Sequence, residues 1–298
     1  MEPTKSGTIS ILQDLASQIA KSALMAIRPV RRWRLSRPRT SFYLGETDAY
    51  LEKSAFLGLN LLLEHAGGVK DKAVCEIGAG DFLSSGLSIL AAGAKNYTVI
   101  DRFPGNYSGE TAKQVYVSIA ENWDRYYPDI AWDSSLVVSG FPENCKDRID
   151  LIGEAIETAD SENKFDIICS FQVGEHVTDI NAFAEIHNRL LKDDGVGLHR
   201  VDMSPHDVWS LYRDPTTFLR FSDPLWKMTG SNRGIPNRRR HHEFLAAFKQ
   251  ANLETEVLLT ESFEKSVVDL KRVNASFQKM PEDSVLTKTA IYRLRKRY

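Results

Sequence analysis

The chain has 298 residues, of which 42% are hydrophobic and 26% charged, and its formal net charge is -2. This is the composition of an ordinary globular protein with enough apolar material for one large core. The balance of charge argues against nucleic acid as a partner, because a domain that follows phosphates carries a basic excess.

Residues 1–40 differ from the rest, and we expect a helical, arginine-rich extension ahead of a domain spanning 41–298. Six arginines and no acid lie within 28–39. One interpretation is a helix that lies on an anionic membrane surface or docks a partner. The other, which we favour, is a helix packed on its own domain and followed by a solvated basic linker. Its apolar side chains recur at helical spacing but are largely alanine: Ile9, Leu12, Ala16, Ile19, Ala20, Ala23 and Ile27.

From residue 70 onward, strand and helix patterns alternate. Helices are predicted at 82–93, 109–126, 179–193 and 240–251, with a further helical stretch before the last strand. Strands are predicted at 73–77, 97–101, 148–155, 165–170, 196–202, 253–260 and 285–295. The alternation is typical of a parallel sheet with crossover helices. We therefore expect an α/β fold with a doubly wound, mostly parallel, seven-stranded Rossmann-like sheet.

An insertion interrupts this rhythm at about 203–238, after the fifth predicted strand. It contains four prolines and several aromatic residues, including Trp209 and Trp226. Insertions after the carboxyl end of a strand commonly shape substrate sites. We expect an inserted substrate lobe here.

A glycine-rich turn directly follows the first predicted strand. Gly78 and Gly80 allow a tight turn and a close approach to a ligand, and the helix behind them presents free amides. Asp101 ends the second strand, where a carboxylate can accept both hydroxyls of a ribose. Leu83 occupies the place of the third glycine in the dinucleotide fingerprint, which disfavours an oxidoreductase. Glu76 suits a cofactor with a cationic amino group better than a pyrophosphate.

These motifs, in their order, resemble those of class I S-adenosylmethionine-dependent methyltransferases over roughly residues 70–202. The resemblance rests on E-x-G-x-G at 76–80, Asp101, Gly-Glu-Ala at 153–155, FDIICSFQVGEHV and RLLKDDG. It implies S-adenosylmethionine as the cofactor, with Gly78 and Gly80 under its methionine part and Glu76 supporting the loop and the amino group. It also implies that Asp101 binds the ribose. Glu154, where the family more often has Asp, and Ala155 would flank the adenine.

Methyl transfer to a hydroxyl needs a base, and three histidines lie near the ends of the fourth and fifth strands. His176 belongs to a Glu-His pair that is common in this superfamily and often structural. His199, inside a strand, is also explained by packing, and His206 by a turn. We name His206 as the first catalytic candidate and His176 as the second, because strand ends face the ligand crevice.

The segment from Ser231 to His242 holds four arginines, so Arg233 and Arg238 are candidates to hold an anionic group of the acceptor. A solvated helix start is an equal alternative. Together with the insertion before it, this segment loosely resembles uncharacterised methyltransferases of bacterial polysaccharide and cell-envelope gene clusters. It implies O-methylation of a sugar or glycolipid-like acceptor. The alternatives are a small-molecule methyltransferase of secondary metabolism and a catalytically silent, cofactor-binding partner protein.

The three cysteines, Cys75, Cys145 and Cys169, form no pair at metal-ligand spacing, and we assign no metal. Two of them fall in predicted buried strands, which fits a reducing compartment. No stretch is apolar enough to span a membrane, and the N-terminus lacks the order of a signal peptide. We expect a cytoplasmic protein with no nucleic-acid partner and with possible peripheral membrane contact through residues 1–40.

Overall fold

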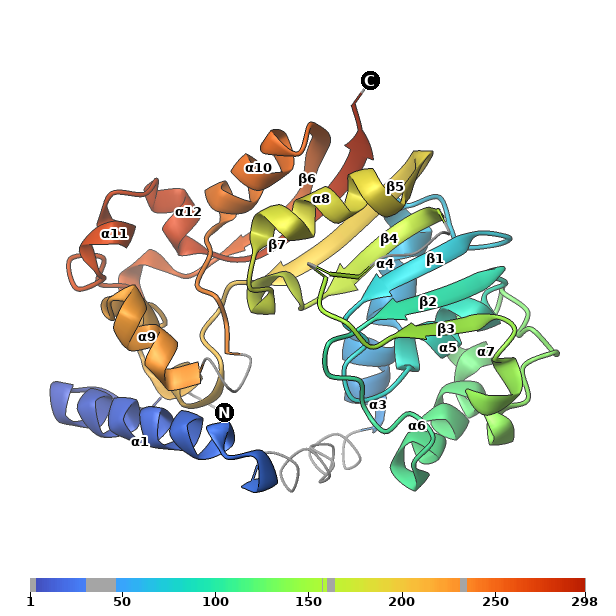
Figure 1. Ribbon diagram of the computed structural model, residues 1–298, viewed down its shortest axis with the longest axis horizontal. Helices are drawn as coiled ribbons and strands as arrows, with labels where there is room; N and C mark the ends of the chain where they lie inside the picture. The colour runs from blue at the N-terminus through green and yellow to red at the C-terminus, as the bar shows by residue number, and fades with distance from the viewer. Residues whose placement is uncertain (1–3, 31–46, 157, 160–163, 231–234, 298) are drawn as a thin grey trace.

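The computed structural model describes residues 4–30, 47–156, 158–159, 164–230 and 235–297. Seven strands form one sheet in the order β3-β2-β1-β4-β5-β7-β6 (Figure 1). Strands β1 to β5 pair in parallel, whereas β7 is antiparallel to both β5 and β6. The strands are β1 (Ala73–Ile77), β2 (Asn96–Ile100), β3 (Ile149–Ile152), β4 (Phe165–Phe171), β5 (Leu191–Asp202), β6 (Leu253–Ser262) and β7 (Thr287–Lys296). The expected mostly parallel, seven-stranded sheet is confirmed.

Helices cover both faces of this sheet (Figure 1). Neighbouring strand residues contribute to opposite layers, so Val74 and Ile167 pack on one side while Cys75 and Ile168 pack on the other. The first layer uses α3 (Thr47–Tyr50), the π-helix η2 (Leu51–Ala55), α4 (Leu57–His65), α5 (Ser84–Ala91), α6 (Glu110–Glu121) and α7 (Trp123–Tyr126). The second layer uses α8 (Ile180–Leu190) and α10 (His241–Gln250). The chain is therefore doubly wound, and the order of strands reverses between β1 and β4.

Strand β5 begins earlier than the sequence predicts. Its register with β4 jumps from Leu191 to Val196 while the partner strand advances only from Phe165 to Ile167. The polar residues between them bulge out of the ladder, so regular pairing covers the predicted 196–202. The bulge leaves the carboxyl end of β5, at Asp202, beside that of β4.

A third apolar cluster lies outside the sheet layers and forms the core of a lobe. It unites the insertion after β5 with the N-terminal helix α1 (Thr8–Ala26) and with the segment between β6 and β7. Its short elements are η6 (Asp207–Leu211), η7 (Thr217–Arg220), α9 (Asp223–Gly230), α11 (Ala275–Gln278) and α12 (Glu282–Leu286). The sequence predicts the insertion as a separate lobe but not its union with these two distant segments. Further 3-10 turns are η3 (Val138–Gly140), η4 (Glu143–Cys145), η5 (Gly174–His176) and η8 (Lys265–Val267).

Candidate active site

The turn between β1 and α5 requires both of its glycines. Gly78 and Gly80 each have a φ of 74°, a left-handed conformation that other residues adopt only with strain. A Cβ on Gly78 would lie 2.7 Å from Cγ2 of Val173, in the segment that follows β4. A Cβ on Gly80 would meet nothing within 4 Å, so this glycine borders open space. The first glycine thus allows close packing and the second leaves room for a ligand.

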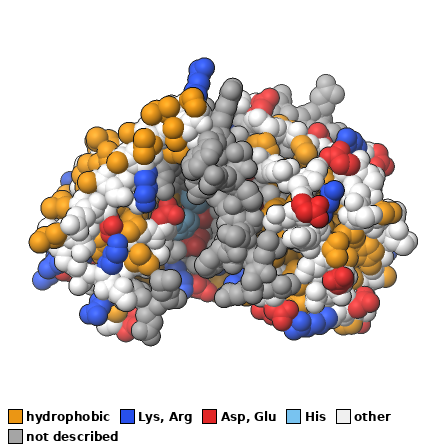
Figure 2. Space-filling view, turned by 90° about the horizontal axis from the view of Figure 1, so that it is seen from below, with side chains coloured by type: hydrophobic (Ala, Val, Ile, Leu, Met, Phe, Trp, Pro, Cys, Tyr) orange, Lys and Arg blue, Asp and Glu red, His pale blue; other side chains and the backbone are white. Residues whose placement is uncertain are grey.

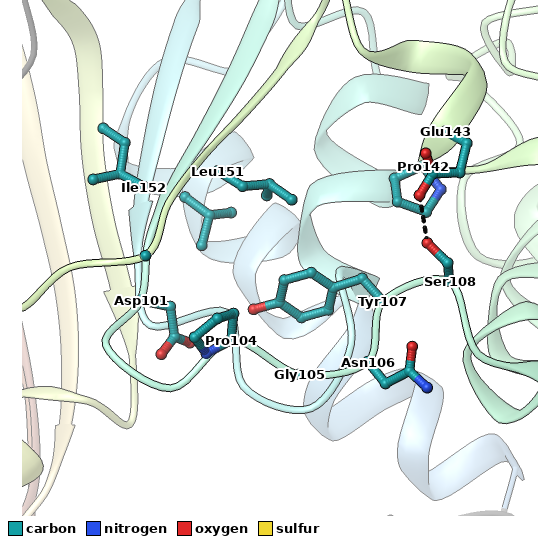
Figure 3. A pocket seen from close by; sticks show the side chains of 12 residues that line it. Asp101, Pro104, Gly105, Asn106, Tyr107, Ser108, Pro142, Glu143, Leu151 and Ile152 are labelled. Carbon is teal, nitrogen blue, oxygen red and sulfur yellow. Dashed lines mark hydrogen bonds between the residues drawn. The ribbon is translucent and has the colours of Figure 1, made fainter. Parts of the chain in front are cut away.

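Asp101 joins this turn to the end of β2. Its Oδ2 accepts a hydrogen bond from the amide of Gly80 at 3.3 Å, and its Oδ1 accepts one from the amide of Phe103 at 2.7 Å. Burial raises the pKa of Asp101, although these backbone hydrogen bonds act in the opposite direction. The carboxylate lines a cavity of about 320 Å³ between the ends of β2 and β3 (Figure 3). This volume is within the range of small-molecule sites.

The loop after β2 supplies half of the residues that line the cavity (Figure 3). Tyr107 is the feature that the sequence did not reveal. Its Oη is buried and has no hydrogen-bond partner in the part of the chain that the structure describes. An unpaired buried hydroxyl costs free energy unless a ligand or water pairs with it. In Figure 3 its ring reaches toward Asp101 and Leu151, and the residue forms part of the cavity wall.

A second group of polar side chains lies where β4 and β5 end. His206 Nε2 lies 3.8 Å from Oδ2 of Asp202, the last residue of β5. The His206 ring packs against that of His176, with the ring centroids 5.1 Å apart. Glu175 is almost fully buried, and its Oε2 accepts a hydrogen bond from the amide of Asp202 at 3.3 Å. The structure therefore brings both catalytic candidates together and adds two carboxylates.

The charges of this group are set by burial and by close partners. Burial alone would lower the pKa of His206, but the nearby negative charge of Asp202 outweighs it, and the pKa is raised. Burial acts on Asp202 in the opposite sense, yet hydrogen bonds from His206 and Ser204 lower its pKa. Burial raises the pKa of Glu175 to about 8. At neutral pH, Asp202 is thus ionised and Glu175 largely holds its proton.

The two regions meet at the switch point of the sheet. Val173, which a side chain on Gly78 would strike, lies two residues before Glu175. Asn237 fixes this segment by donating from Nδ2 to the carbonyls of Gly174 and Val177, at 2.9 and 3.0 Å. Ligands of doubly wound sheets bind in the crevice outside the carboxyl ends of the strands, at this point of reversal.

Residues 48–258 match the model of a protein family described as a methyltransferase domain. The chain belongs to this methyltransferase family. It is an enzyme that uses S-adenosylmethionine as its cofactor. No curated protein matches the chain.

Several solved structures are similar to it. The YcgJ protein from Bacillus subtilis is 13% identical with a TM-score of 0.44, and the alignment covers 81% of this chain and 99% of that one. A putative methyltransferase from Bacillus halodurans is 14% identical with a TM-score of 0.42, and the alignment covers 79% of this chain and 96% of that one. An S-adenosylmethionine-dependent methyltransferase from Mesorhizobium loti is 12% identical with a TM-score of 0.41, and the alignment covers 76% of this chain and 92% of that one.

The residues around the cavity fit this cofactor. Asp101 offers a carboxylate to hydroxyl groups, Tyr107 offers an unpaired hydroxyl, and Gly80 leaves the loop open. When bound, S-adenosylmethionine supplies a methyl group on a sulfonium, which transfers by in-line displacement. The methyltransferase itself must bind the two reactants, align them and keep water away from them.

The expected cofactor residues other than Asp101 do not line the cavity. Glu76 is 2% exposed, and its carboxylate accepts a hydrogen bond from the hydroxyl of Tyr97, with its pKa raised to about 7 by burial. That position fits support of the loop rather than direct contact with an amino group. Glu154 is exposed and Ala155 half-buried, whereas Ile152 and Gly153 line the cavity. The role of the 154–155 pair stays a prediction.

The third histidine candidate is part of the core. His199 is fully buried, and its ring nitrogens lie 2.8 Å from Oγ of Ser170 and 2.7 Å from Nε2 of His187. Nδ1 of His187 lies 3.0 Å from the carbonyl of Ala184, so it carries the proton and Nε2 accepts from His199. Both rings are satisfied as neutral groups. His199 packs in the fold and takes no part in the crevice.

The arginine hypothesis needs a correction. Arg238 is buried inside the lobe, where its guanidinium donates to the carbonyls of Phe218 and Phe221 and pairs with Asp223. It also lies over the ring of Trp226 at 5.0 Å. Its donors serve its own lobe, so we withdraw it as an acceptor-binding residue. Arg233 lies outside the described residues.

The described residues also contain one group that could hold a cation. Donor atoms of Glu175, His176 and His206 all lie within 4.8 Å of one another. No ligand spacing in the sequence indicates it, because the three side chains meet only through the parallel pairing of β4 and β5.

Proposed function

We propose that this methyltransferase acts on a hydroxyl oxygen of a sugar or glycolipid-like acceptor, with His206 as the general base. The observation that carries the proposal is the pairing of His206 with Asp202 at the crevice end of β5. A sugar hydroxyl is almost wholly protonated at neutral pH, so its proton must leave as the methyl group arrives. Asp202 orients the imidazole and stabilises the imidazolium that forms.

The charges of the crevice support a neutral acceptor. Asp202 is ionised, and the group contains a second carboxyl, Glu175. An acceptor carboxylate would meet repulsion from Asp202, whereas hydroxyl groups donate to carboxylates readily. An acceptor with several hydroxyls can therefore donate to Asp202 and present another hydroxyl to His206.

The aromatic side chains of the lobe do not support the proposal directly. Trp209, Tyr212 and Trp226 are buried in the lobe's own core, so they are not exposed platforms for stacking against a sugar. The lobe instead contributes to the site through Asn237, which holds the segment carrying Glu175 and His176.

The test has a chemical part and a mutational part. Mass spectrometry of host glycans and lipids, with and without the gene, should reveal one species that lacks a single methyl group. A missing methyl on a small non-glycan metabolite would favour the secondary-metabolism alternative. Cofactor binding without any methylated product would favour a silent partner protein.

With the acceptor in hand, His206→Ala should lower turnover by roughly 10²- to 10⁴-fold and leave cofactor affinity unchanged. His176→Ala is the matched control, because its ring packs on that of His206, whereas it is His206 whose Nε2 lies 3.8 Å from Asp202. A large loss at His176 with none at His206 would move the role of base to His176. If neither substitution lowers turnover tenfold, an already ionised acceptor replaces the hydroxyl.

A further inference from the structure

The N-terminal helix α1 is held against the lobe by one face only. Leu15, Gln18 and Ser22 are buried there. Asp14 fixes the helix by accepting hydrogen bonds from Lys5 Nζ at 2.8 Å and from the hydroxyl of Tyr212 at 2.7 Å. The strand-like segment before the helix also pairs with residues 211–213 of the lobe. The orientation of α1 about its own axis is thereby set.

The opposite face of α1 is apolar and exposed. Ile9, Leu12, Leu24 and Ile27 are 75%, 58%, 53% and 50% exposed. Spacings of three and four residues place them on one side of the helix, together with exposed alanines and one glutamine. These are Ala16, Ala20, Ala23 and Gln13. In the view from below, on the side where α1 lies, hydrophobic side chains gather over the left of the molecule (Figure 2).

The charged side chains beside this apolar face are basic. Lys21 and Arg28 are exposed beside it, and Asp14, the only acid of the helix, is already paired. The sequence carries seven basic side chains and no acid between Asp14 and Glu46. Whatever covers the face must therefore be apolar in its interior and negatively charged at its surface.

We propose that the exposed face of α1 is a binding site for an anionic lipid surface, on which the helix lies parallel to the membrane plane. Such a helix buries its apolar side chains at the boundary of headgroups and acyl chains, while basic side chains meet anionic headgroups. No helix in the described part of the chain is long and apolar enough to cross a bilayer. A second copy of the chain is a poor occupant, because two such faces would bring like charges together.

Vesicle sedimentation with the full chain tests the proposal. The protein should bind vesicles of phosphatidylcholine with about 30% phosphatidylglycerol, and should not bind pure phosphatidylcholine vesicles. Raising the salt from about 0.05 M to about 0.5 M should weaken this binding, because the charges are exposed. Equal binding to both vesicle types, or to neither, would overturn the proposal.

Two variant pairs locate the surface. Ile9→Ser with Ile27→Ser should weaken partitioning about tenfold or more. Val117→Ser with Val137→Ser is the matched control, because these side chains are also exposed but lie elsewhere, and binding should not change. Lys21→Gln with Arg28→Gln should weaken binding about tenfold and reduce its dependence on salt.

Each variant should melt like the parent chain and bind S-adenosylhomocysteine equally well. Unchanged lipid binding after the Ile9 and Ile27 substitutions would refute the assignment of the face. A full-chain dimer in analytical ultracentrifugation that these substitutions dissociate would instead make it a contact between copies.

Discussion

Replacing Asp101 by Asn tests the cofactor site at the residue that joins its two halves. The carboxylate accepts from the amides of Gly80 and Phe103, and it lines the cavity. Asparagine keeps the shape but loses the charge and one acceptor oxygen. A hydrogen bond to a charged group contributes about 1.5–3 kcal/mol, so the dissociation constant for S-adenosylmethionine should rise about 10- to 150-fold.

Isothermal titration calorimetry with S-adenosylmethionine and S-adenosylhomocysteine measures this change. Glu254→Gln is the matched control, because it neutralises an exposed carboxylate on β6, at the far edge of the sheet from the cavity. Its affinity should stay within about twofold. A thermal melt without ligand should show both variants folded. A dissociation constant that does not change in Asp101→Asn, or that rises equally in Glu254→Gln, would refute the assignment of the ribose contact to Asp101.

Four further predictions follow from the same geometry. Tyr107→Phe should weaken cofactor binding about 2- to 12-fold, since it removes one hydroxyl that a bound ligand can pair with; unchanged calorimetry would exclude that contact. Asp202→Asn should move the acidic limb of the kcat/KM profile to lower pH, because Asp202 raises the pKa of His206 and only the neutral imidazole accepts a proton; an unmoved limb would contradict this role. Activity should survive dialysis against a chelator, and a loss that a divalent cation restores would reassign Glu175, His176 and His206 as ligands. Burial lowers the pKa of His187 to about 4, below the 6.5 of an unfolded histidine. The free energy of unfolding should therefore be highest above pH 6.5 and fall by up to about 1.4 kcal/mol per pH unit as the pH drops toward 4. Denaturant titrations should show a weaker dependence of this free energy on pH in His187→Gln.

The sequence predicts the sheet and the glycine turn because both are encoded locally. A short apolar run followed by Gly78 and Gly80 has few alternatives to a strand and a tight turn. Asp101 could be identified for the same reason, since it ends the next apolar run. Tyr107 could not, because nothing in its neighbourhood shows that its ring turns inward or that its hydroxyl lacks a partner.

Periodicity also failed to show which side of α1 is packed. The apolar stripe through Ile9, Leu12 and Ile27 suggested the buried side of a helix, yet the lobe covers Leu15, Gln18 and Ser22. A stripe reports only that one face avoids water, and it does not say whether protein or another apolar phase covers it. Asp14 decides the orientation through Lys5 and Tyr212, and Tyr212 lies 198 residues away in the chain.

The arginines after the insertion show why charge in a loop need not mark a substrate site. Before α9, the insertion consists of short 3-10 turns and irregular segments, which lack the regular hydrogen-bond ladder of a long helix or a sheet. Arg238 donates to two of them, and Arg240 donates to the carbonyls of Met203, Val285 and Thr287. A guanidinium suits this task, because it offers five donors in a fixed plane and stays charged when buried. Arg240 ties the end of β5 to the start of β7. The arginines thus hold the frame that carries Asp202 and His206, the residues to which we assign the acceptor in the proposed function.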